Sequence, residues 1–181
     1  MNKCSSSFSE DIRNCSTVVE LLRLRISRQP NQNAFTFLLD GETVETRLTY
    51  VQLDTCARRI AAQLQAQGLN GERALLLYPA GLDFLTAFFG CLYAGVIAVP
   101  VYPPRRNQKL SRLLSIVNDA KPAIALTTTS ILTDIEKEWT SDAELSKLKL
   151  LATDTIDNNG KENEFIISSV TPDSLAFLQY T

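Results

Sequence analysis

Apolar residues recur every three or four positions at two places in the first third of the chain, and this spacing predicts two helices. The first helix is expected over residues 17–28, with an apolar face formed by Val18, Leu21, Leu22 and Ile26. Thr49 is expected to cap the second helix, which runs to Gln67. Gly68 then ends it, because glycine readily adopts the left-handed conformation found after helices.

A β-hairpin is predicted between these two helices. Residues 34–39 and 43–50 are extended runs rich in aromatic and β-branched side chains. The pair Asp40-Gly41 separates them, and this pair is typical of a hairpin turn in which both central positions have positive φ.

Strands and helices alternate from residue 74 onward. Short apolar runs predict buried strands at 74–78, 96–99, 123–127, 148–152 and 175–180. Amphipathic patterns predict helices between them, at 82–94, 110–117 and 131–139. Such alternation indicates an α/β fold with a mostly parallel sheet and flanking helices, preceded here by the N-terminal β-hairpin.

The polar segments set the limits of the folded domain. Residues 1–16 lack the apolar run of a signal peptide, so we expect a disordered lead-in followed by a single domain over 17–181. Residues 154–164 are polar and rich in turn-forming residues, which predicts a surface loop.

One apolar segment has the length of a membrane-spanning helix. Residues 84–104 contain no charged side chain. Gly90, Gly95 and Pro100 interrupt the segment, however, and Pro103-Pro104 ends it with a rigid turn. We therefore expect no membrane span, but a helix followed by a buried strand.

Composition excludes several classes of function. Of the 181 residues, 45% are hydrophobic and 21% charged, and the formal net charge of −2 argues against a nucleic-acid partner. Histidine is absent, which excludes Ser-His-Asp and Cys-His catalysis within this chain. The seven glycines are few for a complete phosphate-handling enzyme, so we expect part of the chemistry to lie outside these residues.

The four cysteines are widely spaced and form no C-x-x-C pair of the kind that binds zinc or acts in redox reactions. Cys56 and Cys91 fall within apolar helical patterns, where we expect buried, reduced thiols. Reduced thiols favour a cytoplasmic location.

No phosphate-binding loop is complete. Gly90 and Gly95 have the G-x-x-x-x-G spacing, but the Lys and Ser/Thr that should follow are replaced by Val96-Ile97. The two glycines are therefore interpreted as a close helix contact and a helix end. A dinucleotide fingerprint, G-x-G-x-x-G, is also absent from the sequence.

Charged residues gather in two places without forming a catalytic set. A basic cluster, interpreted first as a solvated helix face and otherwise as a docking patch for an acidic partner or a phosphate, comprises Arg105, Arg106, Lys109 and Arg112. Carboxylates interpreted as surface charge are Glu136, Glu138, Asp142 and Glu144. No catalytic and no metal-binding residue is assigned from these patterns.

Four short motifs, in order, resemble the adenylate-forming superfamily of acyl-activating enzymes. Residues 48–53, Leu-Thr-Tyr-Val-Gln-Leu, resemble its first core motif, and residues 92–101, where a helix ends at Ala-Gly and a strand runs into proline, are similar to its second. The continuation Tyr102-Pro103-Pro104-Arg105 and the final Leu-Ala-Phe-Leu-Gln-Tyr-Thr at 175–181 resemble the fatty acyl-AMP ligase branch in particular.

This resemblance implies that the whole enzyme uses ATP and magnesium to convert a fatty acid into an acyl-adenylate. The acyl group would then pass to the phosphopantetheine of an acyl carrier protein. By this resemblance, Thr181 matches the opening of the family's phosphate loop and Tyr180 lies beside it, and these two are the expected nucleotide-binding residues. We expect an incomplete N-terminal subdomain, truncated before that loop, which needs the remaining C-terminal part of the same enzyme and by itself is inactive and binds no cofactor tightly.

Two alternatives stay open. One is a fragment of a long-chain acyl-CoA synthetase, in which coenzyme A replaces the carrier protein as acyl acceptor. The other is a stand-alone, non-catalytic interaction module that uses the basic cluster at 105–112.

Overall fold

The computed structural model describes residues 10–104, 110–139, 142–156, 165–166 and 168–181. Its centre is a four-stranded sheet of β3 (Arg73–Leu77), β4 (Ile97–Val101), β5 (Ile124–Thr127) and β6 (Lys149–Ala152). The strand order is β4-β3-β5-β6, and every neighbouring pair is parallel. The predicted α/β fold with a parallel sheet is thus confirmed.

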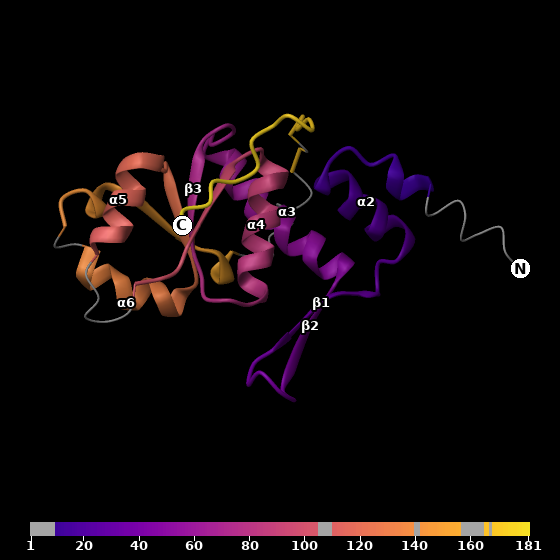
Figure 1. Ribbon diagram of the computed structural model, residues 1–181, viewed down its shortest axis with the longest axis horizontal. Helices are drawn as coiled ribbons and strands as arrows, with labels where there is room; N and C mark the ends of the chain where they lie inside the picture. The colour runs from indigo at the N-terminus through magenta and orange to yellow at the C-terminus, as the bar shows by residue number, and fades with distance from the viewer. Residues whose placement is uncertain (1–9, 105–109, 140–141, 157–164, 167) are drawn as a thin grey trace, which may run out of the picture.

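Helices cover both faces of this sheet (Figure 1). One face carries α2 (Val18–Arg28), α3 (Tyr50–Ala66) and α4 (Leu82–Ala94), and the other carries α5 (Ser111–Ala120) and α6 (Thr129–Trp139). Successive side chains of a strand point to opposite faces, so Leu76 packs with the first group and Leu75 and Leu77 with the second. Strands buried on both faces explain the continuous apolar runs in the sequence.

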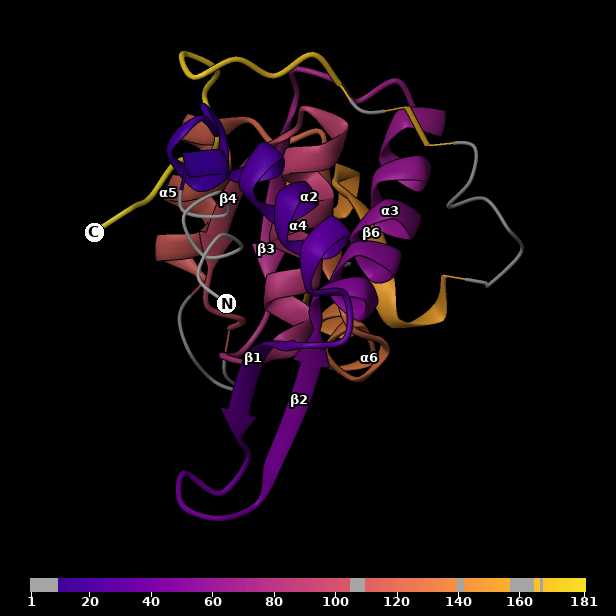
Figure 2. The same cartoon turned by 90° about the vertical axis from the view of Figure 1, so that its right-hand side faces the viewer.

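The N-terminal hairpin pairs β1 (Asn33–Leu38) with β2 (Glu45–Thr49) and projects from the body of the domain (Figure 2). The predicted turn is wrong in detail, since Gly41 has a φ of 80° but Asp40 has no positive φ. Instead, a carboxylate oxygen of Asp40 accepts hydrogen bonds from the backbone N–H groups of Glu42, Thr43 and Val44, each 2.9 Å long. The Asp40 side chain thereby accepts hydrogen bonds that a backbone carbonyl would accept in a tight hairpin turn, as aspartate side chains often do in loops.

Two predicted helix boundaries follow from specific backbone contacts. Thr49 caps α3, because its side chain accepts a hydrogen bond from the N–H of Gln52 while the Gln52 side chain accepts one from the N–H of Thr49. Gly95 ends α4 in the left-handed conformation, with a φ of 68°. A Cβ atom at Gly90 would lie 2.7 Å from Cβ of Ile60 in α3, so the spacing of these two glycines serves packing and a helix end, as predicted.

Helical structure begins earlier than expected. Residues 10–13 are helical, and Arg28 Nη2 lies 2.9 Å from Asp11 Oδ2, so helical structure is present within the segment 1–16 that we expected to be disordered. The ion pair and a hydrogen bond from Asn14 N to Glu10 O (3.2 Å) give this short segment its order. Residues 1–9 lie outside the described part of the chain.

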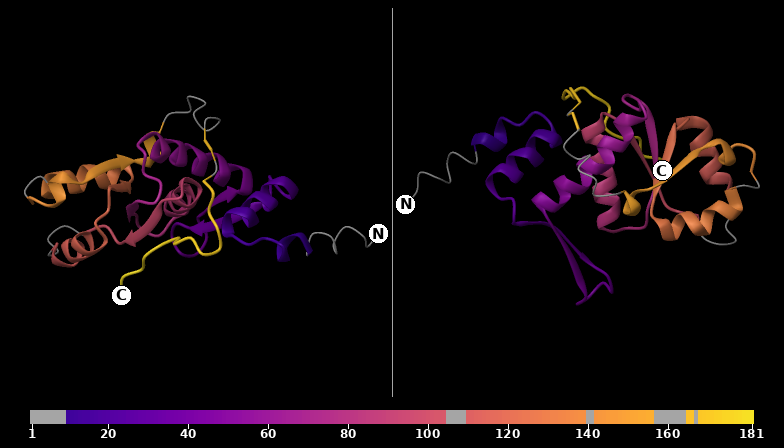
Figure 3. Two further views of the ribbon diagram at one scale, coloured as in Figure 1. Left: turned by 90° about the horizontal axis from the view of Figure 1, so that it is seen from above. Right: turned by 180° about the vertical axis from the view of Figure 1, so that it is seen from behind.

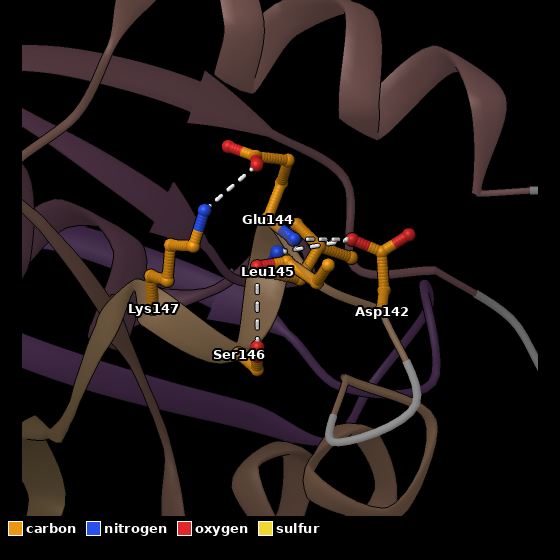
Figure 4. Close-up of polar contacts among 6 residues, drawn as sticks. Asp142, Glu144, Leu145, Ser146 and Lys147 are labelled. Carbon is orange, nitrogen blue, oxygen red and sulfur yellow. Dashed lines mark hydrogen bonds and ion pairs between the residues drawn. The ribbon is translucent and has the colours of Figure 1, made fainter.

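The segment before β6 forms a short 3₁₀ helix, η1 (Leu145–Lys147), held by its own polar side chains (Figure 4). Asp142 Oδ1 accepts hydrogen bonds from the N–H groups of Glu144 (2.9 Å) and Leu145 (3.1 Å), and Lys147 Nζ lies 2.9 Å from Glu144 Oε1. These carboxylates are exposed or half-buried, in agreement with the prediction of surface charge. The side chains of Glu136 and Glu138 lie outside the described part.

The predicted strand at 175–180 is wrong as a full strand. It forms a single parallel bridge between Phe177 and Ala98 of β4, in which Ala98 N donates to Ala176 O (3.0 Å) and Leu178 N donates to Ala98 O (2.9 Å). This segment (yellow in Figure 3) lies at the edge of the sheet, and no described strand pairs with its outer side. Leu175 is accordingly 57% exposed and Phe177 44%, although their apolar pattern is that of a buried strand.

The apolar segment 84–104 does not form one continuous helix. Its residues divide into α4, β4 and the segment after it. Among the helices of the described residues, none combines the length and the apolar character that crossing a membrane would require.

Candidate functional site

The topology of the sheet marks one place at its carboxyl edge. The helix after β3 is α4, which packs on one face, whereas the helix after β4 is α5, which packs on the other. β3 and β4 are neighbours, so their following helices diverge around the carboxyl end of this pair. In open parallel sheets, ligands bind in the crevice where such a divergence occurs.

A cavity of about 780 Å³ opens at this place, and we call it the aromatic groove. The three parts of the chain that line it are α4, the segment after β4 with the adjoining α5, and the C-terminal segment. Its lining includes aromatic, proline and polar residues, namely Phe84, Phe88, Phe89, Tyr102, Pro103, Pro104, Arg112, Phe177, Gln179 and Tyr180.

Phe88 is the centre of a set of aromatic contacts along one wall of the aromatic groove. Its ring centroid lies 6.0 Å from that of Phe84, 6.1 Å from that of Phe89 and 5.9 Å from that of Phe177. The contacts with Phe89 and Phe177 are edge-to-face, with interplanar angles of 87° and 66°, an arrangement that aromatic pairs favour. These rings join α4 to the C-terminal segment and make this wall apolar.

The opposite wall carries the polar groups. Arg112 is the one charged residue among the described residues that line the groove. Its Nη2 donates a hydrogen bond to the backbone carbonyl of Tyr180 (3.4 Å), and the Tyr180 hydroxyl donates to Asp119 Oδ2 (2.6 Å). The hydrogen bond to this carboxylate raises the pKa of Tyr180, with smaller contributions from burial and from the charge of Asp119.

Both residues predicted to contact a nucleotide lie at this edge of the sheet. Tyr180 lines the aromatic groove, and Thr181 follows it as an exposed residue. The structure also brings Tyr180 to the same cavity as the Tyr102-Pro103-Pro104 motif. Arg105, Arg106 and Lys109 lie outside the described residues, so Arg112 alone represents the predicted basic cluster.

A second cavity, of about 1040 Å³, lies between the hairpin and the carboxyl ends of β3 and β6. Its lining includes two carboxylates, Asp83 and Asp154. Burial raises the pKa of Asp83, and the charge of Asp154 raises it further. Asp154 also accepts hydrogen bonds from Thr129 N (2.9 Å) and Thr129 Oγ1 (3.0 Å) at the start of α6. The sequence does not reveal that Asp154 caps α6, because Asp154 and Thr129 are 25 positions apart.

Cys56 and Cys91 are described thiols whose surroundings disfavour reactivity. Cys91 is fully buried, and burial raises its pKa from 9.0 to about 12. Cys56 is half-buried, less than predicted, and burial raises its pKa as well. Raised pKa values keep both groups as neutral thiols, which are poor nucleophiles.

Comparison with known proteins now defines the class. The family of AMP-binding enzymes matches residues 22–181, and this chain belongs to that family. The resemblance to acyl-activating enzymes drawn from the four motifs is thereby confirmed.

Within this family the chain is similar to fatty acyl-adenylate ligases. It is 42% identical to the medium-chain-fatty-acid–[acyl-carrier-protein] ligase JamA of Moorena producens, over 92% of this chain and 28% of that protein. It is 33% identical to the long-chain-fatty-acid–AMP ligase FadD23 of Mycobacterium tuberculosis, over 91% of this chain and 29% of that protein. The chain therefore spans less than a third of the length of these relatives.

A solved structure supports the same placement. The crystal structure of a fatty acyl-adenylate ligase from L. pneumophila, in complex with acyl adenylate and pyrophosphate, superposes with a TM-score of 0.83 at 39% sequence identity. The match covers 95% of this chain and 29% of that one.

Proposed function

We propose that this chain is the N-terminal part of an enzyme that activates a fatty acid with ATP. The observation that carries the proposal is the convergence of Tyr102-Pro103-Pro104 and Gln179-Tyr180, two segments far apart in sequence, on one groove at the carboxyl edge of a parallel sheet. The similarity to fatty acyl-adenylate ligases gives that groove its chemical context.

In the proposed reaction, a carboxylate oxygen of the fatty acid attacks the α-phosphorus of ATP, and pyrophosphate leaves. The product is an acyl-adenylate. Phe84, Phe88 and Phe177 offer an apolar wall to an acyl chain, and each methylene buried there is worth roughly 0.8 kcal/mol, or about four-fold in affinity. Tyr180 and Thr181 would begin the loop that holds the phosphates.

The second half-reaction would transfer the acyl group to a thiol. The sulfur of a carrier protein's phosphopantetheine attacks the acyl carbon, a thioester forms and AMP leaves. The name of the relative JamA, an acyl-carrier-protein ligase, supports this acceptor. Coenzyme A is the second candidate, because a 33% identical relative from Mycobacterium tuberculosis is named a putative fatty-acid–CoA ligase.

Magnesium, the rest of the enzyme and a cytoplasmic setting belong to the same proposal. Within the described residues, no group of three or more Cys, Asp or Glu side chains could hold a metal ion. Since only Thr181, with Tyr180 beside it, matches the opening of the phosphate loop, the 181 residues alone would form part of the active-site wall without turning over substrate.

The test uses the full-length product of the gene. Fatty-acid-dependent exchange of labelled pyrophosphate into ATP is expected for that product and not for residues 1–181 alone. If the full-length product shows no exchange with any medium- or long-chain fatty acid tried, the proposed function is refuted. Robust exchange by residues 1–181 would refute the proposal that they cannot form acyl-adenylate by themselves. Supplying holo-carrier protein and coenzyme A side by side then identifies the acceptor.

A further inference from the structure

Two side chains of α5, those of Arg112 and Asp119, form hydrogen bonds with Tyr180, the residue that precedes Thr181. We propose that Asp119 and Arg112 are positioning residues: by holding Tyr180 they set the direction in which the chain leaves the sheet at Thr181. This inference rests on the proposed function, because that function makes the path of the chain beyond Thr181 the path of a phosphate-binding loop.

The geometry fixes how Tyr180 lies. Its hydroxyl donates to Asp119 Oδ2 over 2.6 Å, and its backbone carbonyl accepts from Arg112 Nη2 over 3.4 Å. The two partners are seven residues apart, which is about two turns, or about 10.5 Å, along a helix. Tyr180 therefore lies lengthwise against α5, with its backbone near the start of the helix and its hydroxyl near the end.

Helix α5, against which Tyr180 lies, is fixed to the sheet by apolar packing and by hydrogen bonds from Arg73. Leu113, Ile116 and Ala120 of α5 are buried in the core on this face of the sheet. At the end of the helix, Arg73 of β3 donates from Nε to Ala120 O (2.9 Å) and from Nη2 to Lys121 O (3.0 Å). Asp119 is therefore next to a helix end that is tied directly to the neighbouring strand.

The backbone contacts with β4 end before Tyr180. Ala98 holds the segment through Ala176 O and Leu178 N, and no described strand pairs with residues 179–181. Tyr180 itself packs against the core on the α5 side of the sheet. Beyond Leu178, the described polar contacts that orient the chain are thus those of Tyr180 with Asp119 and Arg112.

The exposure of Asp119 and Arg112 means that their contacts can orient the chain without contributing much to the stability of the fold. Asp119 and Arg112 are both exposed, and contacts between exposed groups contribute little to folding because water competes for them. Substitutions at these positions are therefore expected to leave the fold intact and to act on the direction of the chain after Tyr180.

The experiment measures steady-state kinetics of adenylate formation by the full-length gene product. Asp119→Ala and Tyr180→Phe are each expected to raise KM for ATP about two- to five-fold, the size of effect that an exposed contact supports, while KM for the fatty acid stays unchanged. The double variant should be no worse than either single variant, because both remove the same contact. Asn118→Ala, at a neighbouring exposed position of α5, is the matched control and should behave like the wild type.

A second readout tests the contact itself. In an ultraviolet titration of the same proteins, Asp119→Asn should lower the pKa of one phenol towards its ordinary value, and Tyr180→Phe should abolish that transition. A wild type without pyrophosphate exchange would overturn the proposed function and this inference together. A wild type that exchanges, with Asp119→Ala and Tyr180→Phe unaffected or additive in their effects, would overturn only the role of Asp119.

Discussion

The hydroxyl of Tyr93 donates a hydrogen bond of 2.8 Å to Oδ1 of Asp54 and so joins α4 to α3 inside the core. Arg58 completes the contact, with its Nε 2.8 Å from Oδ2 of the same carboxylate. Phe165 covers the group, since its ring stacks on that of Tyr93 at 5.3 Å. Asp54 is only 6% exposed, and a polar group buried to this extent costs free energy unless hydrogen-bond partners such as these surround it.

Removing this hydroxyl should destabilise the fold. Tyr93→Phe leaves Asp54 with one partner fewer in the core, and we expect a loss of about 1.5–3 kcal/mol in the free energy of unfolding. Urea denaturation followed by circular dichroism measures it. Tyr102→Phe, which removes a hydroxyl from a side chain that is 67% exposed, is the matched control. Equal stability of the two variants would contradict this account.

Gly90 should not tolerate a methyl group. A Cβ atom there would approach both Cβ and Cγ2 of Ile60 to 2.7 Å, where helices α3 and α4 touch. Gly90→Ala is therefore expected to cost about 1–3 kcal/mol, because overpacking forces the helices apart. Gly81→Ala is the control, since its backbone is extended and its Cβ would meet nothing within 4 Å. Similar thermal midpoints for the two variants would show that the helices can separate at little cost.

Stability should fall at alkaline pH through Cys91. Burial raises the pKa of this thiol from 9.0 to about 12 in the folded state. Below pH 9 both states keep the proton, but above it only the unfolded state ionises, so stability falls by about 1.4 kcal/mol per pH unit until the folded thiol ionises. Burial also raises the pKa of Tyr78 and Tyr93, so phenols add to the loss at higher pH.

Cys91→Ala isolates the contribution of the thiol. Denaturation at a series of pH values should show that this variant loses the part of the slope above pH 9 that Cys91 causes, while the raised pKa of Cys56 keeps a residual slope. Val96→Ala, which also removes volume from a buried site but cannot titrate, should keep the slope. Identical slopes in the two variants would mean that the thiol does not cause the alkaline loss.

Elements whose signal is local could be predicted from the sequence. The apolar period of α3, the cap at Thr49 and the buried run of β3 are each read from a few consecutive residues or turns, and each forms where its pattern indicates. The parallel sheet followed from their order. Tyr180 and the Tyr102-Pro103-Pro104 motif both come at the carboxyl ends of predicted strands, but the cavity that they share was found only in the structure.

What could not be predicted depends on partners remote in sequence. Asp154 caps α6 from another strand end, and Asp119 reaches Tyr180 across 61 positions. The apolar run at 175–180 has the composition of a central strand, but its pairing with β4 is limited to the bridge between Phe177 and Ala98, and no described strand pairs with its outer side. Asp40 shows the same limit at short range, since its side chain, not its φ, makes the turn.

The aromatic groove should select for the acyl chain through Phe88. Its ring contacts Phe84, Phe89 and Phe177, so Phe88→Ala removes the centre of the apolar wall. In the full-length gene product we expect KM for a long-chain fatty acid to rise about ten-fold, from the lost apolar burial, with KM for ATP little changed. Ile166→Ala removes an apolar side chain that is 76% exposed, and should leave both constants unchanged. If Phe88→Ala, folded as judged by circular dichroism, keeps the wild-type KM for fatty acids of every length, the acyl chain binds elsewhere and the groove serves only to seat the C-terminal segment.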